Sequence, residues 1–550
     1  MEKIEIELYN GRVVIMNKGE TFKELLDKIH CQELVALCEL SGDYYELCTE
    51  IPCSGKVNLV NAESEIGIKT YSRTLQYIFI KVSLDLFPKA KIKIEHSISK
   101  GTFGEIAKDK VLTKTEIDKI KEGMKDLIKR DVVINKVEVT KEKAIEIFSG
   151  YEMEDKVKLL NQVDFDNVSL YELEGRYDYF YGDMAYSTGI IKAFDLIQYG
   201  HGFILRNPVE GDVTTLADFK EQKRLANIFY ETEEWLGILG VGEVGSLNEK
   251  VDSKDKKNLI LISEALHEKK IAYMADKIVN KEDIKVVLIA GPSSSGKTTF
   301  ANRLGIQLRV NGLMPIRMSL DDYFVDREFS PKDENGDYDF ESIHSIDLKK
   351  FNQDLKGLLS GEEIEMPRYD FMTGKRGLKI TKLSLPKNGI IIIEGIHGLN
   401  PILTNEIPDG NKYKIYISAL TQLNIDNHNR IATTDVRKVR RIVRDYLSRG
   451  YGAEETLLMW PSIKNGEKKN IFIYQEEADD MFNSTLAYEL CVLKTYAIKE
   501  LEKIQPGSPV YNEAVRLKSF LYFFREIEFE EVLGNSILRE FIGGSCFYKY

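Results

Sequence analysis

The chain has 550 residues, which is enough for about three or four domains. Hydrophobic residues make up 43% of it and charged residues 30%, a composition typical of a soluble globular protein with several apolar cores. The net charge of −12 argues against broad nucleic-acid binding. No apolar run reaches membrane-spanning length, and no signal-peptide pattern opens the chain. We therefore expect a cytoplasmic protein without membrane contact.

Residues 1–62 are predicted to form a small strand-rich module. Hydrophobic residues alternate over Ile4–Leu8, Asn10-Gly11 is a hairpin signal, and apolar residues resume at Val13. Helical spacing follows from Phe22. The segment resembles a TGS module, the small ubiquitin-like (β-grasp) fold at the front of threonyl-tRNA synthetases.

Residues 63–225 are predicted to form a mixed α/β domain. The stretch that begins Tyr71-Ser-Arg-Thr-Leu-Gln resembles the second N-terminal domain of threonyl-tRNA synthetases, which removes mischarged amino acids. That domain's hydrolytic centre uses three histidines and a cysteine, and the matching positions here hold Tyr71, Leu75, Phe180 and Met184. We therefore predict no editing activity, and expect this half to be a scaffold that regulates, oligomerises or contacts RNA.

Residues 226–283 are predicted to be a helical connector that leads into a phosphate-binding loop. The apolar run Val286–Ala290 precedes GPSSSGKTT, and helical spacing follows. Strand, glycine loop and helix in this order direct backbone N–H groups and a helix N-terminus at phosphates. Lys297 can reach the β- and γ-phosphates, and the Thr298 hydroxyl can bind Mg²⁺. The predicted nucleotide-binding residues are Gly291, Ser293, Ser294, Ser295, Gly296, Lys297, Thr298 and Thr299.

Two acidic segments follow the loop along the chain. Asp321 and Asp322 come after a strand-like segment, where a carboxylate can accept a proton from an attacking hydroxyl. Glu394 ends a run of four isoleucines, which is typical of a buried parallel strand, and resembles the acidic metal partner of P-loop enzymes. Each has a structural alternative: the aspartates can cap a turn, and Glu394 can be an ordinary strand-end acid.

A third segment is rich in arginine, from Arg437 to Arg449. Such a run is usually a solvated helix face. After a phosphate-binding loop and a strand-end acid, it favours a lid that neutralises the charge of a transition state.

These motifs, with YDFE at 338–341 and MPRYDF at 366–371, resemble the uridine kinase and phosphoribulokinase family. The resemblance implies that residues 284–490 form a kinase domain that uses ATP and Mg²⁺. It places the catalytic base at Asp321 and the metal at Thr298 and Glu394. It assigns charge stabilisation to Lys297 and to the lid arginines Arg441, Arg444 and Arg449. The acceptor pocket then falls on Phe324, Glu341, Tyr369 and Phe371, although the aromatic residues can equally be core.

Three positions depart from the uridine kinase pattern. Glu341 stands where the family has an aspartate that contacts the ribose, Gly374 replaces a base-recognising histidine, and Tyr451 replaces a later arginine. Sites without a polar reader of the base discriminate weakly, so we predict a nucleoside kinase of broad specificity that phosphorylates a 5′-hydroxyl. Two alternatives stay open: a sugar-phosphate kinase of the phosphoribulokinase type, and a regulatory NTPase that binds tRNA or ribosomes. A GTPase switch is disfavoured, because the N-K-x-D match at 280–283 precedes the loop.

Residues 491–550 are predicted to be a helical tail. The predicted fold class is therefore multidomain α/β and α+β, with a C-terminal kinase built on a parallel sheet flanked by helices. A β-grasp module and a synthetase-like domain precede it. The expected partner is a nucleoside or related small molecule, and RNA contact and oligomerisation are left open.

Overall fold

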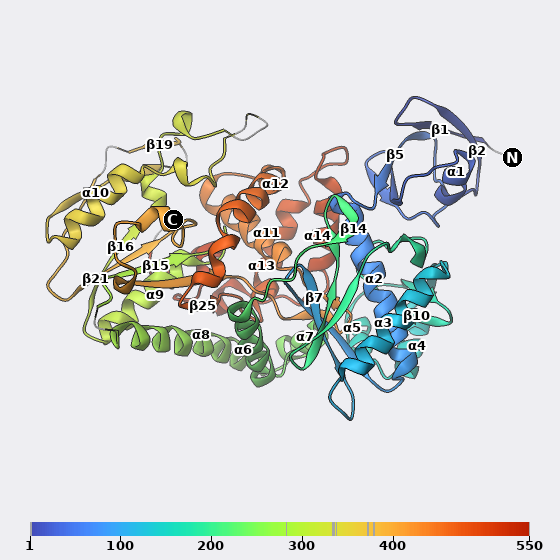
Figure 1. Ribbon diagram of the computed structural model, residues 1–550, viewed down its shortest axis with the longest axis horizontal. Helices are drawn as coiled ribbons and strands as arrows, with labels where there is room; N and C mark the ends of the chain where they lie inside the picture. Colours follow the sequence, from blue (N-terminus) through green and yellow to red (C-terminus); the bar gives the residue numbers. More distant parts are fainter. Residues whose placement is uncertain are drawn as a thin grey trace.

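The computed structural model describes residues 3–281, 283–332, 336, 338–370, 373–377 and 380–548. Figure 1 shows an elongated molecule in which the N terminus lies at one end and the C terminus lies within the opposite half. Throughout these described ranges, no helix is both long and apolar enough to cross a membrane.

The N-terminal module is a five-stranded mixed sheet in the order β2-β1-β5-β3-β4, with one helix against it. β1 buries Ile4, Ile6 and Leu8 and pairs antiparallel with β2 through a turn at Gly11, as the sequence predicted, and it pairs parallel with β5. The elements are β1 (Lys3–Leu8), β2 (Val13–Asn17), α1 (Phe22–Lys28), β3 (Val35–Leu40), β4 (Asp43–Tyr45) and β5 (Gly55–Asn61).

The second region is built on two antiparallel sheets, ordered β11-β12-β7-β6 and β10-β9-β8, and a long buried helix, α2. Its helices are α2 (Glu65–Leu86), α3 (Lys114–Lys129), α4 (Lys141–Gly150) and α5 (Glu154–Gln162). Its strands are β6 (Lys91–Ile98), β7 (Gly101–Ala107), β8 (Asn135–Thr140), β9 (Asn167–Leu173), β10 (Arg176–Asp178), β11 (Asp195–Tyr199), β12 (Gly202–Arg206), β13 (Pro208–Val209) and β14 (Asp212–Leu216).

Three helices connect this region to a five-stranded parallel sheet in the order β16-β21-β15-β22-β25. They are α6 (Lys223–Leu239), α7 (Val244–Asp252) and α8 (Lys256–Val279). The sheet strands are β15 (Val286–Ala290), β16 (Met314–Ser319), β21 (Gly389–Glu394), β22 (Lys412–Ser418) and β25 (Asp480–Asn483). Short antiparallel pairs are formed by β17 (Ile364–Met366) with β20 (Thr381–Leu383), by β18 (Tyr369–Asp370) with β19 (Lys375–Arg376), and by β23 (Asn424–Asp426) with β24 (Asn429–Arg430).

Every residue of β15 is buried, because both faces of the parallel sheet are covered. Val287 and Ile289 join a core with α9 and the C-terminal helices, whereas Val286 and Leu288 face a second core that includes α10. The helices of this half are α9 (Lys297–Val310), α10 (Leu348–Leu359), α11 (Thr433–Arg444), α12 (Ala453–Asn470), α13 (Glu489–Leu501), α14 (Tyr511–Leu521) and α15 (Arg539–Ile542). The segment that we expected as a helical tail places α14 and α15 in the first of these cores.

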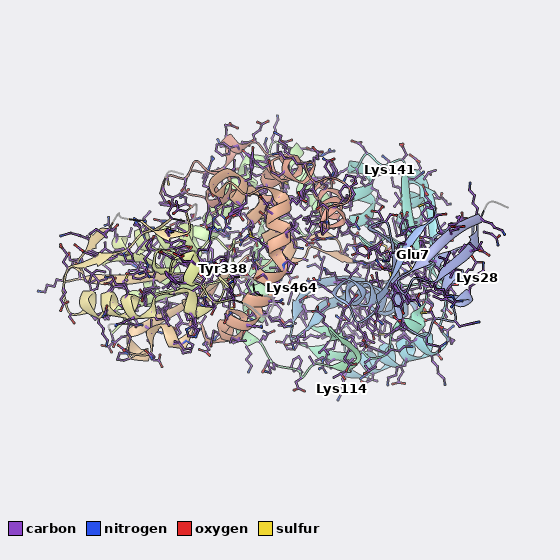
Figure 2. The ribbon with its side chains drawn as sticks, turned by 90° about the horizontal axis from the view of Figure 1, so that it is seen from above. Glu7, Lys28, Lys114, Lys141, Tyr338 and Lys464 are labelled. Atoms are coloured by element: carbon purple, nitrogen blue, oxygen red, sulfur yellow. The ribbon has the colours of Figure 1, made fainter. Side chains whose placement is uncertain are left out.

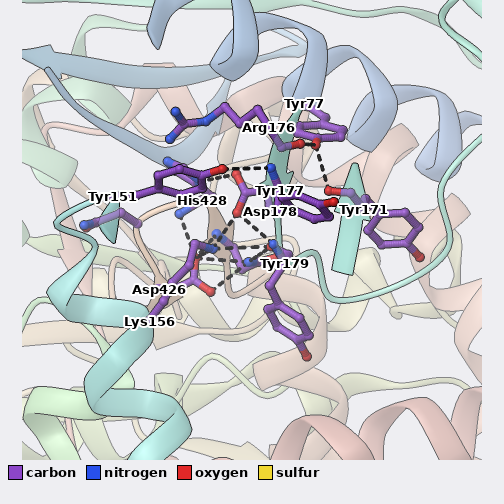
Figure 3. Close-up of polar contacts among 12 residues, drawn as sticks. Tyr77, Tyr151, Lys156, Tyr171, Arg176, Tyr177, Asp178, Tyr179, Asp426 and His428 are labelled. Carbon is purple, nitrogen blue, oxygen red and sulfur yellow. Dashed lines mark hydrogen bonds and ion pairs between the residues drawn. The ribbon is translucent and has the colours of Figure 1, made fainter. Parts of the chain in front are cut away.

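A buried polar cluster joins the two halves (Figure 3). The Lys156 ammonium on α5 lies 3.1 Å from Asp178 Oδ1 and 3.0 Å from Asp426 Oδ1, and His428 Nδ1 lies 2.7 Å from Asp178 Oδ2. Asp426 and His428 belong to the β23–β24 hairpin, which leads directly into α11. The hairpin also exchanges hydrogen bonds with the backbone of Ile94 on β6.

α12 gives a second, exposed contact between the halves. Lys464 Nζ lies 3.0 Å from Glu65 Oε1 at the start of α2. Figure 2 shows Lys464 in the middle of the molecule, between Tyr338 of one half and Glu7 of the other.

Candidate active site

The loop between β15 and α9 curls into a phosphate-binding conformation. Ser294 and Gly296 adopt φ values of 59° and 84°, which turn the chain so that α9 begins at Lys297. The Lys297 ammonium donates to the carbonyl oxygens of Gly291 and Pro292, at 3.0 Å each. The Lys297 ammonium, which we predicted to contact the phosphates, is therefore held against the loop itself.

The predicted metal side of the site forms where three strands end. Register places Ser319 of β16 beside Glu394 of β21, and the Glu394 carboxylate accepts from the Ser319 hydroxyl at 2.9 Å and from the Thr298 hydroxyl at 3.3 Å. Burial, and then the nearby charge of Asp321, raise the pKa of Glu394 to about 7. Hydroxyl and carboxylate oxygens are ligands that suit Mg²⁺, so this set fits the ion.

Asp321 and Lys297 lie within electrostatic reach of each other. Asp321 follows β16 in a short 3₁₀ turn, Leu320–Tyr323, and is half-buried. Burial lowers the pKa of Lys297, and the charges of Glu394 and Asp321 oppose that change. The structure thus gathers the ammonium and both carboxylates at the carboxyl end of the sheet, where ligands bind in open α/β folds.

α11 turns its arginines toward the loop. Arg437, Arg440, Arg441 and Arg444 share one helix face, and all are at most 9% exposed. Arg437 donates to the Ser293 carbonyl at 3.0 Å, and Arg441 donates to the Ser293 hydroxyl at 2.7 Å. Their burial contradicts the alternative of a solvated helix face.

One buried carboxylate gathers the three arginines that the family resemblance singles out. Asp445 begins a π-helical turn, Asp445–Arg449, after α11. Its oxygens lie 3.1 Å from Arg441, 2.7 Å from Arg444 and 3.8 Å from Arg449. Burial, and then the charge of Arg444, lower the pKa of Arg449 to about 10. Three guanidinium groups on one carboxylate leave an excess of positive charge that suits phosphate oxygens.

Three of the four predicted acceptor residues, Phe324, Glu341 and Tyr369, belong to the described part of the chain, and the charges of Arg441 and Lys297 act on Glu341. The rings of Phe324 and Tyr369 are 5.6 Å apart, Phe324 is 7% exposed, and the Tyr369 N–H donates to Asp322 Oδ1 at 3.4 Å. Glu341 lies against Gly466 of α12, and burial, followed by the charge of Glu467, raises its pKa to about 7. Phe371 lies outside the described residues.

The sequence did not predict two contacts of the phosphate-binding loop. Glu467 accepts from the Ser293 N–H at 2.9 Å, and Glu540 accepts from the Thr299 N–H at 2.9 Å. The i, i+3, i+4, i+7 spacing of the arginines could have revealed Arg437 and Arg440 as members of the same face. Glu467 and Glu540 are 174 and 241 residues from their partners, and no local pattern marks them.

The synthetase-like region has no comparable polar site at the positions we compared. Tyr71, Leu75, Phe180 and Met184 are at most 4% exposed and belong to one apolar core. Elsewhere in that region, the ligand atoms of Glu105, His201 and Glu233 lie within 4.8 Å of one another. The Lys93 ammonium, 3.3 Å from Glu233 Oε1, already supplies a cation there, so we assign no metal to this group.

Comparison with known proteins decides the nature of the C-terminal half. Residues 286–485 match the model of the Phosphoribulokinase / Uridine kinase family. This region is a P-loop kinase domain of that family. Among solved structures, the kinase domain is similar to a possible uridine kinase from Bacillus stearothermophilus. That match is 19% identical with a TM-score of 0.27, and covers 39% of this chain and 97% of the other.

The region before the kinase domain is similar to threonine–tRNA ligases. The ligase of Acetivibrio thermocellus is 26% identical over 240 residues, which cover 40% of this chain and 38% of the relative. The ligase of Geobacter sp. (strain M21) is 29% identical over 198 residues, covering 36% and 31%. The chain therefore spans less than half the length of these relatives.

Proposed function

We propose that the protein is an ATP- and Mg²⁺-dependent kinase that phosphorylates the 5′-hydroxyl of a nucleoside. The observation that carries the proposal is the convergence of Lys297, Asp321 and Glu394 at the ends of β15, β16 and β21, beside the arginines of α11. These are the groups that phosphoryl transfer needs: a base, a metal site and fixed positive charge.

Each residue has a distinct task in this mechanism. The Asp321 carboxylate accepts the proton of the attacking hydroxyl. Lys297 and Arg441, Arg444 and Arg449 stabilise the charge that develops on the phosphoryl oxygens. Thr298 and Glu394 would hold Mg²⁺, which neutralises phosphate charge when bound. Asp445 positions the arginines, because its carboxylate contacts all three.

A specific observation favours a sugar phosphate as a second candidate acceptor. At Gly374, where the uridine kinase pattern has a histidine, an added Cβ would lie 2.7 Å from Arg327 Nε. The charge of Arg327 also acts on the phenol of Tyr369. A guanidinium beside the acceptor aromatics suits a phosphate better than an uncharged base.

The two candidates are separated by a phosphate-transfer screen with the full chain, ATP and Mg²⁺. The acceptors are the common ribo- and deoxyribonucleosides and ribulose 5-phosphate, and Lys297→Ala is the control for loop-dependent transfer. We expect turnover of several nucleosides. Turnover of ribulose 5-phosphate alone would replace the first candidate by the second, and no loop-dependent transfer to any acceptor would contradict both.

We also propose that the N-terminal half is a scaffold for RNA contact or oligomerisation. Its similarity to threonine–tRNA ligases supports the proposal. tRNA retention at rising salt tests the RNA contact, because phosphate-driven binding weakens steeply with salt.

A further inference from the structure

The C-terminal segment of the chain lies on the nucleotide-binding loop. Figure 1 marks the C terminus within the kinase half, and the Tyr548 hydroxyl lies 2.7 Å from the Thr299 hydroxyl at the start of α9. Ile537 is fully buried against Gly296, where an added Cβ would lie 2.6 Å from the Ile537 Cγ2 atom. The segment is thus in contact with the turn that starts α9.

Glu540 of this segment satisfies a donor that the loop offers to anions. The first N–H groups of a helix have no intrahelical partner and attract negative charge. In α9, the N–H of Phe300 bonds back to the Gly296 carbonyl, but the N–H of Thr299 donates to Glu540 Oε2 at 2.9 Å. The Thr299 hydroxyl lies 2.7 Å from the Tyr548 hydroxyl. The N–H and the hydroxyl of Thr299 are therefore both engaged by the C-terminal segment.

The charge of Glu540 also reaches the rest of the site. It opposes the burial that lowers the pKa of Lys297, and it adds to the effects that raise the pKa of Glu394. A triphosphate entering the loop meets this third carboxylate beside Asp321 and Glu394. Carboxylate and phosphate oxygens compete for the same N–H donors.

Apolar side chains hold the segment in place. Leu538 and Phe541 are at most 1% exposed, and the Arg440 guanidinium lies 4.9 Å from the Phe541 ring centre. Burial of this kind keeps the backbone docked, so the part of the segment that would have to move when phosphates bind is the Glu540 side chain, which is 7% exposed.

We propose that Glu540 is an internal competitor for the nucleotide phosphates, and so sets the affinity of the site for ATP. The inference rests on the proposed kinase function. The Glu540 carboxylate accepts the hydrogen bond of the Thr299 N–H, and it is displaced when a triphosphate binds. Glu540 is then a residue that determines affinity for the phosphoryl donor and takes no part in the chemical step.

The test compares ATP binding by the full chain with that of Glu540→Gln, in the presence of Mg²⁺, by titration calorimetry. The matched control is Glu528→Gln, which removes the same charge from an exposed position of the same segment. We expect Glu540→Gln to lower the Kd for ATP by about ten-fold, and Glu528→Gln to leave it unchanged. In turnover, the KM for ATP should fall and kcat should stay the same.

Equal or weaker ATP binding by Glu540→Gln would overturn the inference, because the carboxylate would then be a helix cap or a nucleotide contact. Glu540→Ala removes the same charge and replaces Glu540→Gln if that variant does not fold. ATP binding by the wild type without phosphate transfer to any acceptor would contradict the proposed function while leaving this comparison readable. Failure of all the proteins to bind ATP would overturn both.

Discussion

The kinase site and the synthetase-like core are both buried, but they are filled in opposite ways. Around the loop, buried arginines, carboxylates and an ammonium are held in hydrogen-bonded groups, as in Arg440 with Glu489. At the positions compared with the editing centre, apolar and phenolic side chains pack together, and the rings of Tyr77 and Phe180 are 4.9 Å apart. Buried charges are costly unless they are paired, and around the loop they are paired, whereas apolar packing stabilises the fold without such partners.

The largest expected effect concerns the charged residues of the kinase site. Asp321→Ala should lower kcat by about 1,000-fold, because it removes the carboxylate that we propose as the acceptor of the hydroxyl proton, while ATP still binds. Initial rates and ATP titration measure the two quantities. Glu328→Ala, at an exposed acid nearby, is the control, and wild-type turnover in Asp321→Ala would remove Asp321 from the mechanism.

A second substitution leaves a buried charge without its partner. Arg440→Ala should lower the free energy of unfolding of the kinase half by about 3–5 kcal/mol, because Glu489, 2.6 Å away, loses its counter-charge. Chemical denaturation measures the change. Arg309→Ala, at an exposed arginine on α9, should change stability by less than about 0.5 kcal/mol. Equal effects of the two variants would mean that the buried pair contributes nothing special.

The apolar core of the synthetase-like region is tested on α2. Leu75→Ala should lower the free energy of unfolding by about 2–4 kcal/mol, because it leaves a cavity in a fully buried site, without changing kinase kinetics in the folded protein. Leu86→Ala, on the same helix but 43% exposed, is the matched control. Hydrolysis of mischarged tRNA by the wild-type protein would contradict the prediction that no editing activity is present.

The last effect concerns the pH dependence of stability. The pKa of Glu341 is raised from 4.5 to about 7, so between these values the folded protein holds a proton that the unfolded chain has released. This group therefore lowers stability as the pH rises from about 4.5 to 7. Glu341→Gln should be more stable than the wild type by up to about 3 kcal/mol at pH 8, and equal to it at pH 4. A pH-independent difference between the two unfolding curves would contradict this assignment.

Local sequence patterns correctly predicted the strands, the glycine loop and the hairpin turn, because neighbouring residues determine these features. The run Val286–Ala290 is the central buried strand, the glycine loop opens α9, and the isoleucine run brings Glu394 to the end of a parallel strand. The hairpin at Gly11 was predicted for the same reason, since turn chemistry is local.

The parts that escaped prediction depend on distant partners. A run of arginines has the same pattern whether it is solvated or buried. In the structure the arginines of α11 are buried because distant carboxylates, those of Glu467 and Glu489, pair with them. The pattern of the C-terminal segment predicted a helix, but it did not indicate that Glu540 accepts a hydrogen bond from the Thr299 N–H. Tertiary contacts of this kind have no periodic signal.

The polar cluster around Lys156 bears on how this protein can be handled in the laboratory. Its ammonium comes from one half of the chain, while Asp426 comes from the other, and the side chains are at most 2% exposed. A kinase half produced alone would present Asp426 and His428 to water without their partners, on the hairpin that leads into α11. Kinase assays are therefore best made on the undivided polypeptide, and an inactive fragment would say little about the catalytic groups.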